Sequence, residues 1–197
     1  MSVCVDLSTF DNSWYKTGRS KLVVALWFFF GSPIVRCSIN PSSSIRRFLL
    51  RLFGARVAAG VVIKPGVRIK YPWRLAIGAN SWIGEDCWID NLDDVTIGSN
   101  ACVSQGAYLC TGNHDWSDST FGLIVKPIAI GDGAWVGAMS VIGPGVTVGQ
   151  GAVALVGSIV TASIPAFEIH GGGPARLMRH RVPRMREKHT DEELMWS

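Results

Sequence analysis

The stretch IAIGDGAWVGAMSVIGPGVTVGQGAV, residues 128–153, decides the fold of this chain of 197 residues. Within it an aliphatic residue returns every six positions, at Ile130, Val136, Ile142 and Val148. Six matches neither the 3.6-residue period of a helix nor the two-residue alternation of a strand. A fixed six-residue period instead predicts a β-solenoid with three short strands in each turn.

The same period runs through most of the chain. Fifteen positions carry the aliphatic repeat, and they are Val57, Ile63, Ile69, Ile77, Ile83, Ile89, Ile97, Val103, Leu109, Ile130, Val136, Ile142, Val148, Ala154 and Val160. Two-residue slips precede Ile77 and Ile97, and a longer interruption precedes Ile130. With three strands per coil, the fifteen positions predict an all-β fold, a parallel β-helix of about five coils over residues 57–165. Stacked coils satisfy one another's backbone groups.

Three stretches resemble one known family, and they are YLCTGNHDWSD (108–118), KPIAIGDGAWVG (126–137) and IGPGVTVGQGAV (142–153). The family is that of the hexapeptide-repeat acyltransferases, and the resemblance covers about residues 57–180. It implies a left-handed β-helix. Within the family, RRFLLRLFGARV (46–57) and IKYPWRLAIG (69–78) are similar to the colanic acid and exopolysaccharide O-acetyltransferases.

Charge separates the chain into three segments. Residues 57–165, the expected catalytic β-helix with a loop excursion at 110–128, hold five Lys or Arg against eight Asp or Glu, a net charge of −3. The flanks together carry +7. We expect an N-terminal helical extension or cap at 1–56 and a basic segment with a short helix at 166–197. The total of +4 is too small to indicate nucleic-acid binding.

The N-terminal extension has two open interpretations. Ser42, Ser43 or Ser44 can cap a helix whose apolar face carries Ile45, Leu49 and Leu52, with Arg46, Arg47 and Arg51 around it. Such a helix can cover the open first coil. Alternatively, the cationic helix and the aromatic run 27–30 contact an anionic membrane surface.

The compartment follows from two further features. The apolar run 22–35 is shorter than the roughly 20 residues of a membrane-spanning helix. Five cysteines without a C-x-x-C pair or a signal peptide indicate the cytoplasm, with peripheral contact at the inner face of the membrane as the finer expectation.

The loop excursion holds His114, the only histidine within residues 57–165. A histidine can take the proton of an attacking hydroxyl and return it to a leaving thiolate. The resemblance points to the same residue, because the family's catalytic histidine lies in a motif that matches Asn113-His114. Asp115 or Asp118 either orients His114 or serves the turn.

The resemblance also implies the cofactor site. The donor is acetyl-CoA, and the backbone N–H of Ala138 stabilises the oxyanion. The remaining cofactor-binding positions are Trp135, Gly137, Val156, Thr161, Arg176 and Arg179. Alanine follows Thr161 where the family often has lysine, which shifts phosphate binding to the two arginines. The family's assembly is a homotrimer with its sites at the subunit interfaces.

The acceptor is expected to be a sugar or lipid-linked glycan. Asp90 and Asn91, at the second slip, and Asn113 and Asp115, in the excursion, are the candidate residues for binding its hydroxyls. The predicted function is acetyl-CoA-dependent O-acetylation of a sugar hydroxyl, by direct transfer in a ternary complex.

Two alternatives stay open: N-acetylation of an amino-sugar, and a non-enzymatic solenoid scaffold. No metal site is expected, since a three-histidine zinc site on this fold needs more than His114.

Overall fold

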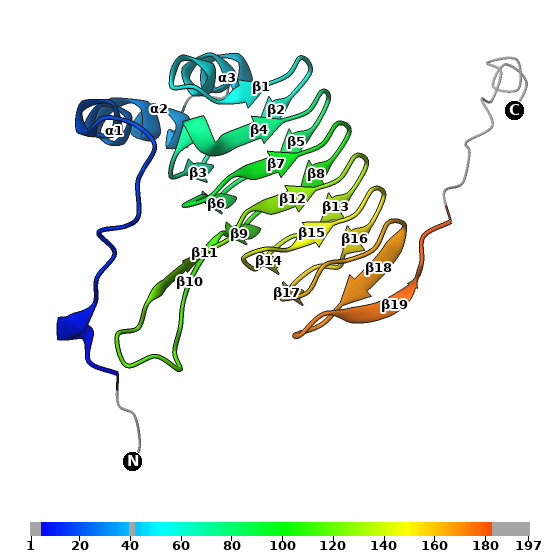
Figure 1. The fold of residues 1–197 in the computed structure, drawn as a ribbon. Helices are drawn as coiled ribbons and strands as arrows, with labels where there is room; N and C mark the ends of the chain where they lie inside the picture. Colours follow the sequence, from blue (N-terminus) through cyan, green and yellow to red (C-terminus); the bar gives the residue numbers. More distant parts are fainter. Residues whose placement is uncertain (1–4, 40–41, 183–197) are drawn as a thin grey trace, which may run out of the picture.

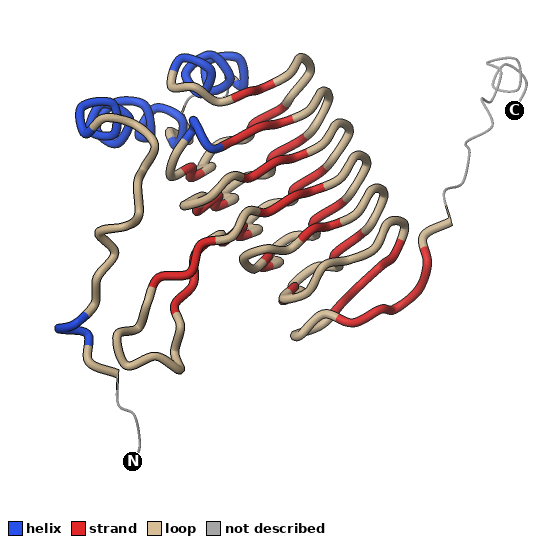
Figure 2. Tube along the Cα trace, viewed as in Figure 1, coloured by secondary structure: helices blue, strands red, loops and turns tan. Residues whose placement is uncertain are grey.

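The protein is a solenoid of three flat faces with helices at one end and a hairpin projecting from its side (Figures 1 and 2). The computed structural model describes residues 5–39 and 42–182. The strands of successive coils pair in parallel along each face. This arrangement confirms the β-helix that the six-residue period predicts.

Each face is one sheet. The first face contains β1 (Arg56–Val57), β4 (Leu75–Ile77), β7 (Val95–Ile97), β12 (Ile128–Ile130) and β15 (Thr147–Val148). The second face contains β2 (Val62–Ile63), β5 (Trp82–Ile83), β8 (Cys102–Val103), β13 (Trp135–Val136), β16 (Val153–Ala154), β18 (Glu168–Gly171) and, antiparallel at its edge, β19 (Arg176–His180). The third face contains β3 (Arg68–Ile69), β6 (Trp88–Asp90), β9 (Tyr108–Cys110), β14 (Val141–Ile142) and β17 (Ile159–Val160). These strands form the five complete coils predicted, and a bridge from Ile164 to Val148 begins a partial sixth coil with β18.

The core is the aliphatic ladder. All fifteen repeat positions are at most 7% exposed. Parallel pairing aligns them from coil to coil, as in the register of Ile77 with Ile97 and of Ile130 with Val148. The small residues of the repeat lie inside the corners, where the Ser140 hydroxyl donates to the Leu155 carbonyl of the next coil at 2.8 Å. Inward aliphatic packing and coil-to-coil hydrogen bonds therefore hold the same frame together.

The two slips of the repeat are local bulges of the coil. The first contains a 3-10 helix, Pro72–Arg74, and the second contains the fully buried Asn91. The Asn91 side chain accepts from the Tyr71 N–H at 2.9 Å and donates to the carbonyls of Tyr71 and Arg74 at 2.7 and 3.1 Å. The Asn91 side chain thus satisfies backbone groups at the first slip, where the irregular coils do not pair with each other.

Helices close the first end of the solenoid. They are α1 (Lys21–Leu26), a π-helical turn (Trp27–Gly31), α2 (Ser32–Arg36) and α3 (Ser43–Leu52), and we call them the helical cap. Trp27 is fully buried, packs on Phe53 and donates its indole N–H to the Ile69 carbonyl at 3.1 Å. These contacts support the interpretation of the N-terminal helices as a cap. Among the described residues, no helix combines the length and apolar character needed to cross a membrane.

The orientation of α3 differs from the prediction. Ser42 caps this helix as expected, but its buried face carries Arg46 and Leu50, while Ile45 and Leu52 are 45% and 66% exposed. Arg46 donates to the Val35 carbonyl at 2.9 Å, and Arg51 donates to the Val57 carbonyl at 2.8 Å. Of the three residues expected on the apolar face, Leu49 is partly buried and packs against the core, whereas Ile45 and Leu52 do not. The covered face includes arginines because the open coil and the helix ends present carbonyls, which arginine satisfies and leucine cannot.

The C-terminal segment also differs from the prediction. Within residues 166–182 the expected helix is absent, and the antiparallel strands β18 and β19 occupy this part of the chain. β18 pairs with β16 of the last coil, and β19 pairs with β18 as the new edge strand, so the pair extends the sheet of the second face. Arg181 fastens it by donating to the carbonyls of Gly133 and Gly151 at 3.0 and 2.9 Å. The remainder of the predicted basic helix lies outside the described residues.

Candidate active site

The loop excursion predicted at 110–128 contains a β-hairpin of β10 (Gly112–His114) and β11 (Leu123–Val125). It projects away from the stack of coils (Figure 1). The Asp115 N–H donates to the Gly122 carbonyl at 2.8 Å and closes the hairpin turn. His114 ends β10 and lies at the start of this turn.

The hairpin fixes the orientation and the tautomer of His114. Its Nδ1 lies 2.9 Å from the carbonyl oxygen of Phe121, and its ring stacks on the Phe121 ring with centroids 4.3 Å apart. A carbonyl only accepts, so Nδ1 carries the proton and Nε2 of the neutral ring keeps its lone pair. No described residue hydrogen-bonds to Nε2. His114 is therefore held ready to accept a proton through Nε2.

Phe121 presents its carbonyl from an uncommon backbone conformation, with φ at 52°. A bulky residue in the left-handed region costs free energy, which the surrounding contacts must offset. Sequence reasoning missed Phe121 because a backbone carbonyl can come from any residue type. The nearby Phe10, whose ring centroid lies 5.5 Å from that of His114, was missed as well.

Asp115 and Asp118 are turn residues. Asp115 accepts from the N–H and hydroxyl of Ser117, and Asp118 accepts from those of Thr120. The hydrogen bonds from Ser117 lower the pKa of Asp115. Of the two interpretations that the sequence left open, these contacts support the turn and leave the orientation of His114 to the Phe121 carbonyl.

The N-terminal segment lies along the hairpin and the second slip. The Asp6 N–H donates to the Ser119 carbonyl at 2.8 Å, and the Tyr15 hydroxyl donates to the Leu92 carbonyl at 2.7 Å. Burial raises the pKa of Tyr15 to about 12. This segment carries no repeat and no motif, so the sequence offered no signal for its place beside His114.

Four of the predicted cofactor positions lie together along the second face and its following corner. Trp135, on β13, is 47% exposed and donates its indole N–H to the Ser104 hydroxyl at 2.8 Å. Ala138 follows at the corner, where its carbonyl accepts from Gly157 and its N–H has no hydrogen-bond partner among the described residues. Val156 is the exposed neighbour in the next coil. We call Trp135, Gly137, Ala138 and Val156 the second-face strip.

Gly137 allows two successive coils to pack closely within the second-face strip. A Cβ at this position would lie 2.6 Å from the Val156 backbone nitrogen and 2.7 Å from the Ala154 carbonyl oxygen. Glycine therefore allows the two coils to approach each other and leaves the corner free of a side chain.

The other predicted cofactor residues lie farther along the solenoid. Arg176 and Arg179 are exposed on β19, next to β18 of the second face. Thr161 is exposed just after β17, beyond the third face. Within one chain, His114 on the projecting hairpin is not brought together with the second-face strip (Figure 1).

The chain is similar to known proteins over most of its length. A family profile described as "Hexapeptide repeat of succinyl-transferase" matches residues 127–162. WcaF of Escherichia coli, named for acetyl transfer in colanic acid biosynthesis, is 40% identical over 177 residues, which cover 90% of this chain and 97% of the relative. The chain belongs to the hexapeptide-repeat acetyltransferase family.

Two solved structures extend the comparison to this acetyltransferase fold. The hexapeptide-repeat acetyltransferase VCA0836 of Vibrio cholerae, in complex with acetyl-CoA, has a TM-score of 0.72 at 25% identity and covers 84% of this chain and 92% of its own. A galactoside acetyltransferase in complex with coenzyme A has a TM-score of 0.69 at 27% identity and covers 83% of this chain and 84% of its own.

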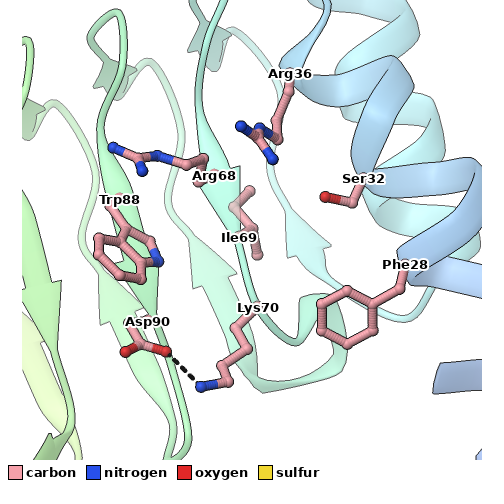
Figure 3. A pocket seen from close by; sticks show the side chains of 8 residues that line it. All are labelled: Phe28, Ser32, Arg36, Arg68, Ile69, Lys70, Trp88 and Asp90. Atoms are coloured by element: carbon pink, nitrogen blue, oxygen red, sulfur yellow. Dashed lines mark ion pairs between the residues drawn. The ribbon is translucent and has the colours of Figure 1, made fainter. Parts of the chain in front are cut away.

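The predicted acceptor-binding residues of this acetyltransferase differ in exposure and in their hydrogen-bond partners. Asn113 is exposed, and its side-chain oxygen accepts from the His114 N–H at 2.8 Å. Asp90 is half-buried between Lys70 and Tyr108, with its carboxylate 3.0 Å from the Lys70 ammonium (Figure 3). The prediction that Asn91 binds substrate is wrong, because its side chain is fully buried and bonded to backbone groups of the first slip.

Proposed function

We propose that this acetyltransferase transfers the acetyl group of acetyl-CoA to a sugar hydroxyl of an exopolysaccharide or capsule-type glycan. The observation that carries the proposal is the bond from His114 Nδ1–H to the Phe121 carbonyl, which leaves Nε2 free to act as a base. The identity to WcaF over nearly the whole chain supports the glycan class.

His114 handles the proton in both halves of the reaction. Nε2 accepts the proton of the sugar hydroxyl as its oxygen attacks the thioester carbonyl, and the same proton later goes to the departing thiolate sulfur. The Phe121 carbonyl stabilises the transient imidazolium through Nδ1–H. The N–H of Ala138, which has no partner in the part of the chain that the structure describes, fits the oxygen of the attacked carbonyl, where negative charge develops. The acetyl group passes directly from sulfur to oxygen.

The residues of the second-face strip fit the thioester donor. The half-exposed Trp135 and the exposed Val156 offer apolar surface for an extended chain. Arg176 and Arg179 are exposed, have no carboxylate partner within residues 5–39 and 42–182, and offer guanidinium groups for phosphates. When bound, acetyl-CoA supplies the activated acetyl group.

The active site requires a second copy of the chain. Because one chain holds His114 and the second-face strip apart, we propose a homotrimer in which the hairpin of one subunit meets the strip of its neighbour. Mixing His114→Ala chains with Trp135→Ala chains during refolding would restore activity, since some interfaces then combine an intact His114 with an intact Trp135. Failure of the mixture to exceed either inactive variant would contradict shared sites.

We also propose that the helical cap contacts an anionic lipid surface. Leu22, Leu26, Phe29 and Phe30 recur at the spacing of one helix face and are 40–75% exposed, with Lys21 beside them. A Phe29→Ser/Phe30→Ser variant should lose sedimentation with vesicles of anionic lipid while keeping its oligomeric state. Equal sedimentation of both proteins would reject the proposal.

The function is tested on the product. Glycans from cells with and without the gene are compared by mass spectrometry, before and after mild alkali, which cleaves acetyl esters and spares acetamides. We expect one acetyl group that depends on the gene and is removed by alkali. An alkali-stable acetyl group would instead establish N-acetylation, and no difference in acetylation would contradict the function.

A further inference from the structure

A pocket of about 220 Å³ lies between the helical cap and the third face (Figure 3). We call it the cap pocket, and its lining residues are Phe28, Ser32, Arg36, Arg68, Ile69, Lys70, Trp88 and Asp90. Pockets for drug-sized ligands usually have about 300–1,000 Å³. The cap pocket therefore suits a small group rather than a whole cofactor.

The charge of the cap pocket is unbalanced. Three cations, Arg36, Arg68 and Lys70, face one carboxylate, and that carboxylate, Asp90, is paired with Lys70 at 3.0 Å. Neither arginine side chain has a carboxylate partner among the described residues. Cations that share a pocket without a counter-ion raise its energy, so an anion between them is favoured.

The structure holds Arg68 in place for such a ligand. Its guanidinium lies 4.9 Å from the ring centroid of Trp88, and Trp88 is stacked on Tyr108 at 4.5 Å. A guanidinium that rests on an aromatic ring keeps its N–H edges free for two parallel hydrogen bonds. Burial raises the pKa of Tyr108, whose hydroxyl donates to Asp90. The Tyr108 hydroxyl thus stays protonated and adds no negative charge.

The cap pocket lies between the catalytic hairpin and the exposed aromatic residues of the cap. The Asp90 carbonyl accepts from the Thr111 hydroxyl at 3.0 Å, and His114 follows Thr111 by three residues, about 10 Å along an extended strand. On the other side, Phe28 lines the pocket and is followed by Phe29 and Phe30, which are exposed. A molecule bound in the pocket can therefore extend toward His114.

We propose that the cap pocket binds the phosphate or diphosphate that joins the acceptor sugar to its carrier. The inference rests on the proposed function, because it takes the acceptor to be a glycan. Arg36 and Arg68 bind the phosphoryl oxygens, and the Ser32 hydroxyl adds a neutral donor. The same group occurs in a polyprenyl diphosphate-linked glycan and in a nucleoside diphosphate sugar.

The test is a calorimetric titration with inorganic pyrophosphate and with UDP-glucose. Arg36→Gln/Arg68→Gln should weaken the binding of both by about tenfold or more, since two charge-assisted contacts are lost. The matched control is Arg19→Gln/Arg56→Gln, which removes the same charge from exposed positions outside the pocket and should leave binding unchanged.

Vesicles distinguish the two carriers. Recruitment of the wild type to vesicles containing polyprenyl diphosphate, lost in Arg36→Gln/Arg68→Gln, would assign a lipid carrier. Binding of UDP-glucose without such recruitment would assign a nucleotide carrier. Either result supports a phosphate site.

Three outcomes would overturn the proposal. Equal weakening of pyrophosphate binding in both double variants would indicate general electrostatic attraction. Displacement of pyrophosphate by acetyl-CoA would show that the pocket binds the phosphates of the acetyl donor. Dissociation of the oligomer in the Arg36→Gln/Arg68→Gln variant would show that these arginines stabilise a contact between subunits. Because the titration needs no turnover, it remains informative even if the acetyl-transfer function fails.

Discussion

In the coils of residues 128–160 every repeat side chain points inward and is at most 2% exposed, whereas no residue in hairpin β10–β11 is fully buried. The coil strands pair with the coils next to them, while the two hairpin strands pair with each other. Positive φ occurs in both regions, in these coils at Gly133, Met139, Gly145, Gly151 and Gly157, and in the hairpin turn at Phe121 with a φ of 52°. Regular stacking builds a rigid frame, and the interruption of the frame carries His114, the proposed base.

The difference predicts where substitutions affect activity and where they affect stability. In the hairpin, the proposed role of His114 is chemical, and its ring packs on the rings of Phe10 and Phe121 outside the core. In the coils, the aliphatic ladder contributes packing and no chemistry.

The largest effect is expected for His114→Ala. Loss of a general acid–base residue typically costs about 10²–10⁴ in rate. The kcat for acetyl transfer should fall by this factor, while the circular dichroism spectrum and thermal midpoint stay close to those of the wild type. Asp118→Asn is the control, because it keeps the turn bond to Thr120 and removes a nearby charge. Similar losses of kcat in both variants would show that the effect comes from disturbing the conformation of the hairpin and not from removing a base.

The coil side of the comparison is tested by Ile142→Ala. This side chain is fully buried, and its truncation should lower the free energy of unfolding by roughly 2–5 kcal/mol. Ile159→Ala, at a 49% exposed position, should cost less than about 1 kcal/mol. Chemical denaturation measures both values. Equal costs would contradict the inward and outward assignment of the third face.

Asn91→Ala separates structure from substrate binding at the second slip. Up to three backbone groups lose their partner, so the free energy of unfolding should fall by about 1–3 kcal/mol. The kcat/KM of the folded variant should stay near that of the wild type. A fall in kcat/KM without a loss of stability would restore Asn91 as an acceptor residue.

The smallest effect is expected at Tyr15. Replacement by phenylalanine removes the bond to the Leu92 carbonyl and should cost about 1 kcal/mol below pH 10. The folded-state pKa of about 12 lies above the unfolded value near 10, so the contribution of neutral Tyr15 is present below pH 10 and is lost as the pH rises toward 12. Unfolding free energies of wild type and Tyr15→Phe should converge over that window. Parallel curves would show that Tyr15 does not titrate with folding.

The sequence predicted the coils well because their rule is local. Each repeat position needs an aliphatic residue, and all fifteen were found buried. The ends followed no repeat, so α3 was assigned the wrong buried face and the β18–β19 pair was mistaken for a helix. At α3 the structure satisfies backbone groups left open by the first coil, and at β18–β19 it satisfies those left open by the last coil. A pattern of residue types does not reveal this requirement.

The candidate site was predictable where the proposed role belongs to a side chain. His114 could be identified from its motif and from its isolation in the excursion. Its orientation could not, because it depends on the Phe121 carbonyl and on a long-range approach of Phe10. Asn91 was misassigned because a buried amide that bonds to backbone has the same sequence signal as an exposed one.

The central claim is that the hairpin selects, for the neutral form of His114, the tautomer with its proton on Nδ1 and its Nε2 unprotonated. Nitrogen-15 NMR of histidine-labelled protein reports this tautomer, with His114→Ala assigning the signal among the four histidines of the chain. We expect a protonated Nδ1 and an unprotonated Nε2 in the neutral form. A neutral His114 with its proton on Nε2 would contradict the account, because the nitrogen assigned as the base would already be occupied.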